Sequence, residues 1–298
     1  MNSKRPLIIY HRNCSDGFGA ALAAWLKYED KADYVAALHG DAPPEVTGRE
    51  VVIIDFAWPR TMTETLQSES RSLLVLDHHD TAARNLAGLD YCRFDQSHSG
   101  AVLAWQHFHP GRAIPHMFSL IEDADLRLYR KGEETARFMA HLKTLPKDFL
   151  IWQDLMTEME QPDRRKELME VYGHTHKHRR AIVHEAARQA RSFCLEDGLS
   201  GYLVEVDDFQ YASDVAEYLA IRAQADGHKG ALGVVWRESK DKPGWVSGSI
   251  RTRDEAVDCQ LIAIQLGGGG GHPKSSGILI PSDHWKETLK KVQQTGSN

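Results

Sequence analysis

The sequence predicts an α/β protein whose N-terminal part contains a parallel sheet with helices on both faces. Three short apolar runs support this prediction, at residues 7–10, 51–54 and 73–76. Continuous apolar runs of this length, separated by stretches of helical periodicity, are typical of parallel strands buried on both faces. Strand-like and helix-like segments alternate again beyond residue 200, which predicts a smaller C-terminal α/β domain after a helical linker.

The segments between the apolar runs have the composition of helices. Residues 18–28 follow Asp16 and are rich in alanine and leucine, which predicts a helix packed on the sheet. Residues 34–38 are expected to form a further strand. Pro59 is expected to begin the next helix, where its missing N–H group costs nothing.

The middle of the chain predicts helices without strands. Ser99-Gly100-Ala101 is expected to open an apolar helix that runs through Phe108, and residues 114–126 are expected to form another. The long segment that follows is charged and poor in strand-forming residues. We therefore predict three parts: residues 1–130 as the first α/β domain, 131–194 as a helical cap and linker, and 195–298 as the second domain.

The C-terminal part predicts four strands and two helices. Ser213-Asp214 is expected to cap a helix between the first two of these strands, and a second helix is expected over residues 254–266. The predicted strands cover residues 201–206, 229–236, 245–251 and 277–280.

Carboxylates and imidazoles follow each of the three N-terminal apolar runs, at the point where the strand is expected to end. A single Asp at a strand end is commonly a helix cap or a turn residue, but here three strand ends agree. The carboxyl ends of parallel strands share one edge of a sheet, so these side chains should converge and require a compensating cation. A divalent metal centre is therefore predicted. The set comprises His11, Asp16, Asp55, Asp77, His78 and His79.

Composition limits the class of protein and its partners. With 42% hydrophobic and 26% charged residues, the chain has the make-up of an ordinary globular protein. The formal net charge of -6 argues against duplex DNA as a partner. No apolar stretch approaches the roughly 20 residues that span a bilayer, so no membrane partner is predicted. The four cysteines are far apart and no leader segment precedes the first strand, which predicts a cytoplasmic protein.

Five consecutive glycines at residues 267–271 form the second informative motif. Such a run is costly in chain entropy, so the backbone is expected to turn sharply or to approach another group closely. A flexible linker is the alternative, but a helix precedes this run and a strand follows it at once. We predict a nest of backbone N–H groups suited to a phosphate or a terminal nucleotide. The predicted substrate-binding residues are Arg251, Gly269, Gly270, Gly271, His272, Lys274 and Ser275.

In this order, the motifs resemble those of the DHH phosphoesterase family with its associated C-terminal domain. Residues 11–21 match the first family motif, residues 53–55 the second, and Asp77-His78-His79 is the triplet that gives the family its name. Residues 267–277 match the glycine-rich motif of the associated domain. The resemblance implies a catalytic DHH domain followed by a substrate-binding domain.

The resemblance also implies roles for the polar residues. Asp55 would bridge two divalent ions, and His11 would help to hold one of them. Asp16, His78 and a later aspartate would hold the other ion, with Asp123 as the first choice and Asp125 as the competitor. Asp77 would orient the ring of His78, and His79 would face the scissile phosphate. The implied cofactor is one or two divalent ions, Mn²⁺ in the first place, with Mg²⁺ or Co²⁺ as alternatives.

One position departs from the family pattern. The first motif usually contains two aspartates separated by one residue, but Cys14 occupies the place of the earlier one. A thiol is a soft ligand and matches Mn²⁺ or Mg²⁺ poorly. The second ion is therefore expected to bind more weakly, to be a different metal, or to have its site completed by a substrate phosphate. Alternatively, Cys14 is a buried small residue without a metal role.

The predicted function is metal-dependent hydrolysis of phosphodiester bonds in short oligonucleotides or linear dinucleotides. Adenosine 3',5'-bisphosphate phosphatase and exopolyphosphatase activities are the enzymatic alternatives, and a nucleotide-binding sensor without catalysis is the rival from another class. A homodimer is one alternative for the assembly. Base preference and cleavage polarity are not predicted.

Overall fold

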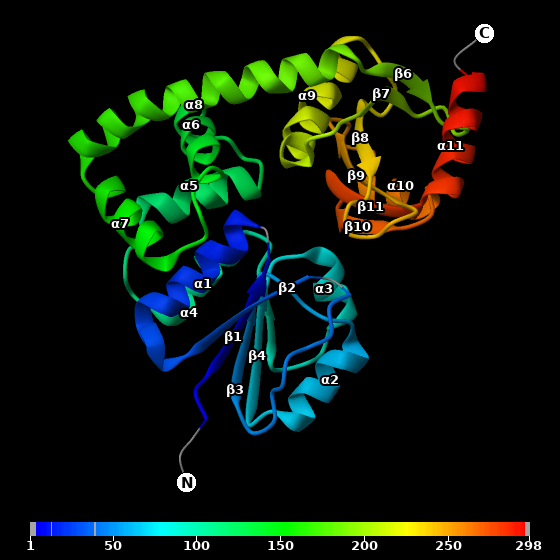
Figure 1. Ribbon diagram of the computed structural model, residues 1–298. Coiled ribbons are helices and arrows are strands. Elements are labelled where there is room, and N and C mark those ends of the chain that lie inside the picture. The colour runs from blue at the N-terminus through cyan, green and yellow to red at the C-terminus, as the bar shows by residue number, and fades with distance from the viewer. Residues whose placement is uncertain (1–3, 13, 39, 296–298) are drawn as a thin grey trace. The chain divides into compact units, whose positions relative to one another are not determined.

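The computed structural model describes residues 4–12, 14–38 and 40–295, and the chain divides into two compact units, Met1–Lys177 and His178–Asn298. Each unit has its own sheet (Figure 1). The division falls within helix α8 (Pro162–Arg188). In the described part of the chain, no helix is both long and apolar enough to cross a membrane.

The first unit is built on a five-stranded parallel sheet in the order β2-β1-β3-β4-β5. The three apolar runs of the sequence form its centre, and the predicted α/β class is confirmed. The edge strand β5 was not predicted, because it has only three residues and none of them is buried. The strands are β1 (Leu7–His11), β2 (Asp33–Ala37), β3 (Glu50–Ile54), β4 (Ser72–Asp77) and β5 (Cys92–Phe94).

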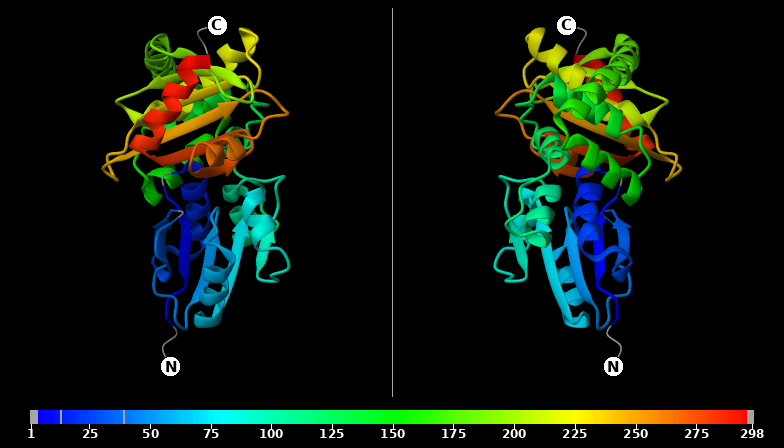
Figure 2. Two further views of the ribbon diagram at one scale, coloured as in Figure 1. Left: turned by 90° about the vertical axis from the view of Figure 1, so that its right-hand side faces the viewer. Right: turned by 90° about the vertical axis from the view of Figure 1, so that its left-hand side faces the viewer.

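Helices cover both faces of this sheet (Figures 1 and 2). On one face, Ile8 and Ile54 pack in one core with Phe18 of α1 and Leu120 of α5. On the other face, Ile53 belongs to a second core that includes residues of α2. The helices are α1 (Ser15–Tyr28), α2 (Arg60–Glu69), α3 (Asp80–Asn85), α4 (Gly100–Phe108) and α5 (His116–Asp125), and a 3-10 turn, Glu29–Lys31, follows α1.

The helices after residue 130 share the core of the first unit. They are α6 (Glu133–Leu142), α7 (Phe149–Met159) and α8. Phe138, Trp152 and Leu168 lie in the same buried cluster as Phe18. Most of the segment predicted as cap and linker therefore belongs to the first unit, because each helix buries an apolar stripe there. The observed division lies at residue 177, whereas the predicted boundaries were at residues 130 and 194.

The second unit contains a six-stranded mixed sheet in the order β10-β11-β9-β8-β7-β6, in which only β7 and β8 are parallel neighbours. Helix α9 packs with one buried cluster, and α10 and α11 contribute to another. The strands are β6 (Arg191–Cys194), β7 (Ser200–Glu205), β8 (Leu232–Glu238), β9 (Trp245–Thr252), β10 (Gly269–His272) and β11 (Ser275–Pro281). The helices are α9 (Ala212–Ala225), α10 (Cys259–Gln265) and α11 (Ser282–Thr295), with a 3-10 turn at Phe209–Tyr211.

Three of the five glycines, residues 269–271, lie in the edge strand β10, where the sequence predicted a nest. Strand β10 pairs antiparallel with β11, and Gly269 lies opposite Ile278. In an extended strand, successive N–H groups point to opposite sides, so they do not converge on one anion. Glycine is required by the backbone: Gly269 has φ +153°, and a Cβ there would lie 2.1 Å from the carbonyl oxygen of Gly277. The close approach is to the neighbouring strand.

Candidate metal centre

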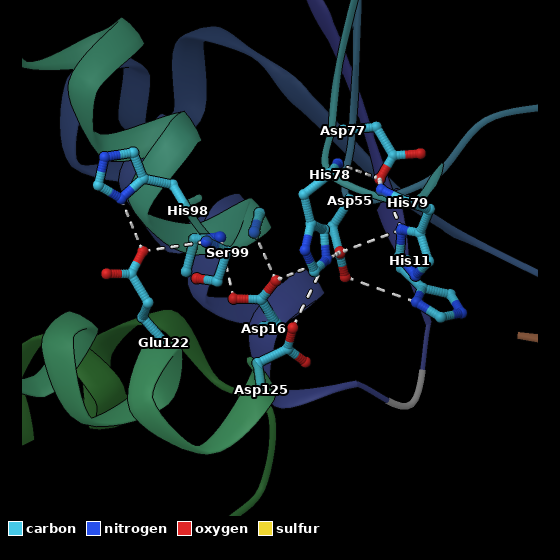
Figure 3. A network of polar contacts seen from close by, with 12 residues as sticks. His11, Asp16, Asp55, Asp77, His78, His79, His98, Ser99, Glu122 and Asp125 are labelled. Carbon is cyan, nitrogen blue, oxygen red and sulfur yellow. Dashed lines mark hydrogen bonds and ion pairs between the residues drawn. The ribbon is translucent and has the colours of Figure 1, made fainter. Parts of the chain in front are cut away.

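Asp55 lies at the centre of the polar cluster, one residue beyond the end of β3 (Figure 3). It is 1% exposed and has φ +57°, a left-handed conformation that costs energy for a residue with a Cβ and that concentrates at functional sites. Its two carboxylate oxygens face different histidines. Oδ1 lies 3.1 Å from Nε2 of His78, and Oδ2 lies 3.5 Å from Nδ1 of His11.

Asp16 is held by the N-terminus of a second helix. It lies in the first turn of α1, and its carboxylate accepts hydrogen bonds from the backbone N–H groups of Gly100 (2.6 Å) and Ala101 (3.0 Å) in α4. The helix dipole of α4 favours the negative charge at this point. A Cβ on Gly100 would lie 2.5 Å from the Cβ of Asp55, so only glycine allows α4 to approach the two carboxylates this closely.

Three groups of ligating atoms result, and within each group the atoms lie within 4.8 Å of one another. Asp55 is shared by two of the groups, and His78 is also shared by two. The groups are Asp16, His78 and Asp125; His11, Cys14 and Asp55; and Asp55, Asp77, His78 and His79. The residues from all three strand ends are thus brought together at one edge of the sheet.

The geometry replaces Asp123 with Asp125 in the candidate ligand set. The carboxylate of Asp125 points into the cluster, with Oδ2 3.5 Å from Nε2 of His78 (Figure 3). The carboxylate of Asp123 instead accepts hydrogen bonds from the backbone N–H groups of Arg130 (2.8 Å) and Lys131 (3.2 Å) and from the hydroxyl of Thr135. Asp123 therefore fixes the loop between α5 and α6. The two aspartates are two residues apart on a helix, so they point in different directions.

Asp77 fixes His79 and not the ring of His78. Its Oδ1 lies 2.6 Å from Nδ1 of His79, and it also accepts the backbone N–H of His78 at 2.8 Å. Burial lowers the pKa of His79, but the hydrogen bond with Asp77 and the charges of Asp77 and Asp55 together outweigh it, so the net pKa is raised. The ring of His78 is oriented by Asp55. Strand β4 ends at Asp77, and the side chains of Asp77 and His78 point in different directions from that end.

Burial and mutual repulsion dominate the electrostatics of the cluster. Burial raises the pKa of Asp16 well above its usual value, and the carboxylates of Asp125 and Asp55 raise it further. Burial also raises the pKa of Asp125. The pKa of Asp55 is raised by burial, but its interactions with His11 and His78 outweigh this and lower it overall. Burial lowers the pKa of His78, whereas its bond to Asp55 and the surrounding carboxylates raise it to about 10. A protonated His78 would balance part of the negative charge of the surrounding carboxylates.

The donor atoms fit a divalent ion. Three buried carboxylate oxygens accept no hydrogen bond within the described residues, one each from Asp55, Asp77 and Asp125. A buried carboxylate oxygen without a donor is costly, and a metal ion would satisfy it. Carboxylate oxygens with imidazole nitrogens form a donor set that Mn²⁺ and similar ions accept in proteins.

Arg251 of the second unit is bound by groups of its own domain. Its Nη1 donates to the hydroxyl of Ser249 and to the carbonyl of Ile250, both at 2.8 Å, and its Nη2 donates to the hydroxyl of Ser213 at 2.9 Å. The guanidinium group therefore links strand β9 to helix α9. Its predicted contact with a substrate phosphate stays a prediction.

Lys274 is held in a similar way. Its ammonium group donates to the backbone carbonyls of Asp254 (2.6 Å) and Val257 (3.4 Å), so it secures the segment before α10. Ser275 begins β11 and lies between β9 and the end of β10 in the sheet. The backbone of His272 ends β10, but its side chain lies outside what the structure describes.

Sequence reasoning missed the residues that surround the N-terminus of α4. The hydroxyl of Ser99 caps the helix by accepting the N–H of Val102. Glu122 accepts the N–H of Ser99 and lies 3.0 Å from Nδ1 of His98 (Figure 3). The Ser99-Gly100 pair correctly predicted the start of this helix, but not its place beside the carboxylates. The hydrogen bond between Gly100 and Asp16 joins residues that are 84 positions apart in the sequence. A local signal for a helix start cannot predict such a contact.

The fold and this cluster define a two-domain α/β protein with a candidate divalent-metal centre at the carboxyl edge of a parallel sheet. Comparison with solved structures gives the type of fold. A DHH-domain protein described as a member of a family of ribosomal proteins matches with a TM-score of 0.61 and 12% identity, over 98% of this chain and 86% of that one. RecJ from Thermus thermophilus, solved in complex with Mn²⁺, matches with a TM-score of 0.51 and 12% identity, over 98% of this chain and 52% of that one. The chain therefore has the fold of the DHH-domain proteins.

Sequence comparison adds one relative. The uncharacterized protein R106 of Acanthamoeba polyphaga mimivirus is 25% identical over 315 residues, which cover 97% of this chain and 71% of that protein. No family model matches the chain.

Proposed function

We propose that this protein is a metal-dependent phosphoesterase of the DHH type that hydrolyses phosphodiester bonds in short oligonucleotides or linear dinucleotides. The observation that carries the proposal is the buried cluster around Asp55, in which three carboxylate oxygens lack hydrogen-bond donors within the described residues. The shared fold with RecJ, which was solved with Mn²⁺, supports it. The net charge of -6 favours a short substrate over duplex DNA.

The cluster contains residues for two ions. Asp16, His78 and Asp125 would hold one, and His11 with Asp55 would hold the other. When bound, such ions neutralise the charge of a phosphate and supply a nucleophile from water near neutral pH.

The remaining residues of the cluster position the reacting groups. Asp77 holds the His79 ring through Nδ1, and we assign His79 Nε2 to the scissile phosphate or the leaving oxygen, where it would hold or donate a proton. The N-terminus of α4 orients the carboxylate of Asp16 through two backbone N–H groups, and its dipole favours the charged form. Asp16 and His79 are thus held by neighbouring groups, and such supporting contacts favour metal-assisted catalysis.

The test is metal-dependent release of mononucleotides. Metal-stripped protein is assayed with a linear dinucleotide and short oligonucleotides, with and without Mn²⁺, and products are separated by chromatography. Asp55→Ala should abolish turnover because it removes the central carboxylate of the cluster, which belongs to two of its three donor groups. Asp90→Ala, which removes an exposed carboxylate of the same unit, is the matched control and should retain activity.

Other outcomes separate the alternatives. Phosphate release from adenosine 3',5'-bisphosphate or from polyphosphate, with no cleavage of dinucleotides, would favour the phosphatase or exopolyphosphatase. Tight nucleotide binding without any product would favour a sensor, which Cys14 motivates because it departs from the usual ligand set. Full activity of Asp55→Ala would contradict the assignment of the centre.

A further inference from the structure

The chain between β1 and α1 brings three chemically different donors together. An imidazole nitrogen of His11, the sulfur of Cys14 and a carboxylate oxygen of Asp55 all lie within 4.8 Å of one another. The Oδ2 atom of Asp55 is buried and accepts no hydrogen bond within the described residues, and it lies 3.5 Å from Nδ1 of His11. Two observations besides the presence of a cysteine therefore point to an ion at this place. One is the grouping of the donor atoms, and the other is the buried Asp55 oxygen that accepts no hydrogen bond within the described residues.

Helix formation does not explain the cysteine. Cys14 is the N-cap residue of α1, with φ -106° and ψ 142°, yet its side chain makes no capping hydrogen bond. Ser, Thr, Asp and Asn are the residues that stabilise a helix from this position, by about 1 kcal/mol relative to Ala. A cysteine here forgoes that contribution.

A glycine shapes the same turn. A Cβ on Gly17 would lie 2.3 Å from the carbonyl oxygen of His11, so only glycine lets the end of β1 pack against the first turn of α1. This packing holds His11 beside Cys14. The local backbone is thus built around the three donors.

The donor types differ between the two candidate ion positions. Asp16, His78 and Asp125 offer two carboxylates and one imidazole, which suits Mn²⁺ or Mg²⁺. His11, Cys14 and Asp55 offer imidazole, thiolate and carboxylate, the three ligand types found in protein zinc sites. Thiolates favour Zn²⁺ over Mn²⁺ because the softer ion forms the stronger bond with sulfur.

We propose that the position formed by His11, Cys14 and Asp55 is a zinc-selective site in which Cys14 binds the ion through its thiolate. The inference deepens the proposed function, since it assigns the second ion of the same centre. Binding forms a metal–sulfur bond and releases the S–H proton to solvent, with no change of oxidation state. The two positions of the centre would then prefer different metals.

Cobalt gives a direct readout of sulfur ligation that needs no enzyme activity. Metal-stripped full-length protein is titrated with Co²⁺, which replaces Zn²⁺ at such sites, and near-ultraviolet absorption is recorded. The parent should show a sulfur-to-cobalt charge-transfer band that saturates with Co²⁺. Cys14→Ser should lose the band, and the control Cys92→Ser, which removes a half-buried thiol outside the cluster, should retain it. A band absent from the parent, or unchanged in Cys14→Ser, would overturn the proposal.

Metal competition tests the selectivity. Protein equilibrated with equal Zn²⁺ and Mn²⁺ is dialysed, and bound metals are quantified by mass spectrometry. Cys14→Asp should lower the ratio of bound Zn²⁺ to bound Mn²⁺ at the second position by at least about tenfold. Even residues that only hydrogen-bond to a metal ligand change metal affinity by about 10–100-fold when they are mutated. Equal Zn²⁺-to-Mn²⁺ ratios in parent and variant would contradict the inference.

The two proposals fail in different ways. A cobalt–thiolate band in a protein that cleaves no phosphate ester would leave the zinc site standing and refute the proposed function. Mn²⁺-dependent cleavage without the band would do the reverse. Thermal melting of the metal-stripped variants, compared with the parent, shows whether either substitution disturbs the fold.

Discussion

Gly100→Ala should weaken metal binding although glycine is not a ligand. The added Cβ would lie 2.5 Å from the Cβ of Asp55 and 2.9 Å from Oδ2 of Asp16. Carbon atoms normally approach to about 3.5–4.0 Å, so one of these groups must move by roughly 1 Å. A displacement of about 1 Å in a catalytic arrangement costs on the order of 100-fold in rate. The overpacking itself should cost about 1–3 kcal/mol of stability.

The assay measures Mn²⁺ affinity by calorimetry, together with the turnover of a dinucleotide. Gly173→Ala is the matched control, because it is also a buried helical glycine of the first unit and its Cβ would meet nothing closer than 3.8 Å. Alanine is the better helix former, so this control should be neutral or stabilising. If Gly100→Ala binds Mn²⁺ like the parent while remaining folded, the approach of α4 does not position the carboxylates.

Two further predictions follow from reassigned residues. Asp125→Ala should weaken Mn²⁺ binding with little change in the melting temperature. Asp123→Ala should instead lower the free energy of unfolding by about 2–4 kcal/mol, because its carboxylate accepts three hydrogen bonds from the loop and α6. Calorimetry and thermal melting of both variants give the comparison, and the reverse pattern would restore Asp123 as the ligand. Lys274→Ala should destabilise the protein by about 1–2 kcal/mol, because the ammonium group of Lys274 donates hydrogen bonds to two backbone carbonyls. A variant with an unchanged melting temperature and a raised KM would instead support the predicted phosphate contact.

The sequence predicted the centre of the first sheet because its strands are continuous apolar runs. The same reasoning placed Asp55 and the triplet at one edge, since strand direction alone decides which ends meet. The edge strand β10 was missed because glycine has no strand propensity and was given a ligand-binding role. Its extended form depends on pairing with β11, which is a tertiary effect.

The ligand set could be predicted only in part. The side chains that follow the parallel strands all lie at the same edge of the sheet. Asp123 and Asp125 lie on a helix, where the direction in which each side chain points depends on how α5 packs. The partner of Asp77 was also misassigned, because the rotation of His78 after the strand end cannot be read from sequence. The hydroxyl and carbonyl groups that bind Arg251 and Lys274 could not be read from sequence, and the contact of these residues with substrate stays a prediction.

The protonation state of the cluster ties metal binding to pH. The pKa of His78 is raised to about 10, so the ring carries a proton below that pH, and a metal-bound imidazole must lose it. Burial also raises the pKa values of Asp16 and Asp125, so protons compete with the ion at all three ligands. Raising the pH removes these competitors, and the apparent Mn²⁺ affinity should rise from about pH 6 to about pH 9, by up to about tenfold per unit for each proton released. Calorimetry in two buffers of different ionisation enthalpy counts the protons directly. An affinity that is constant across this range would mean that His78 is neutral before the ion binds, and would remove its assigned role as the cation of the metal-free cluster.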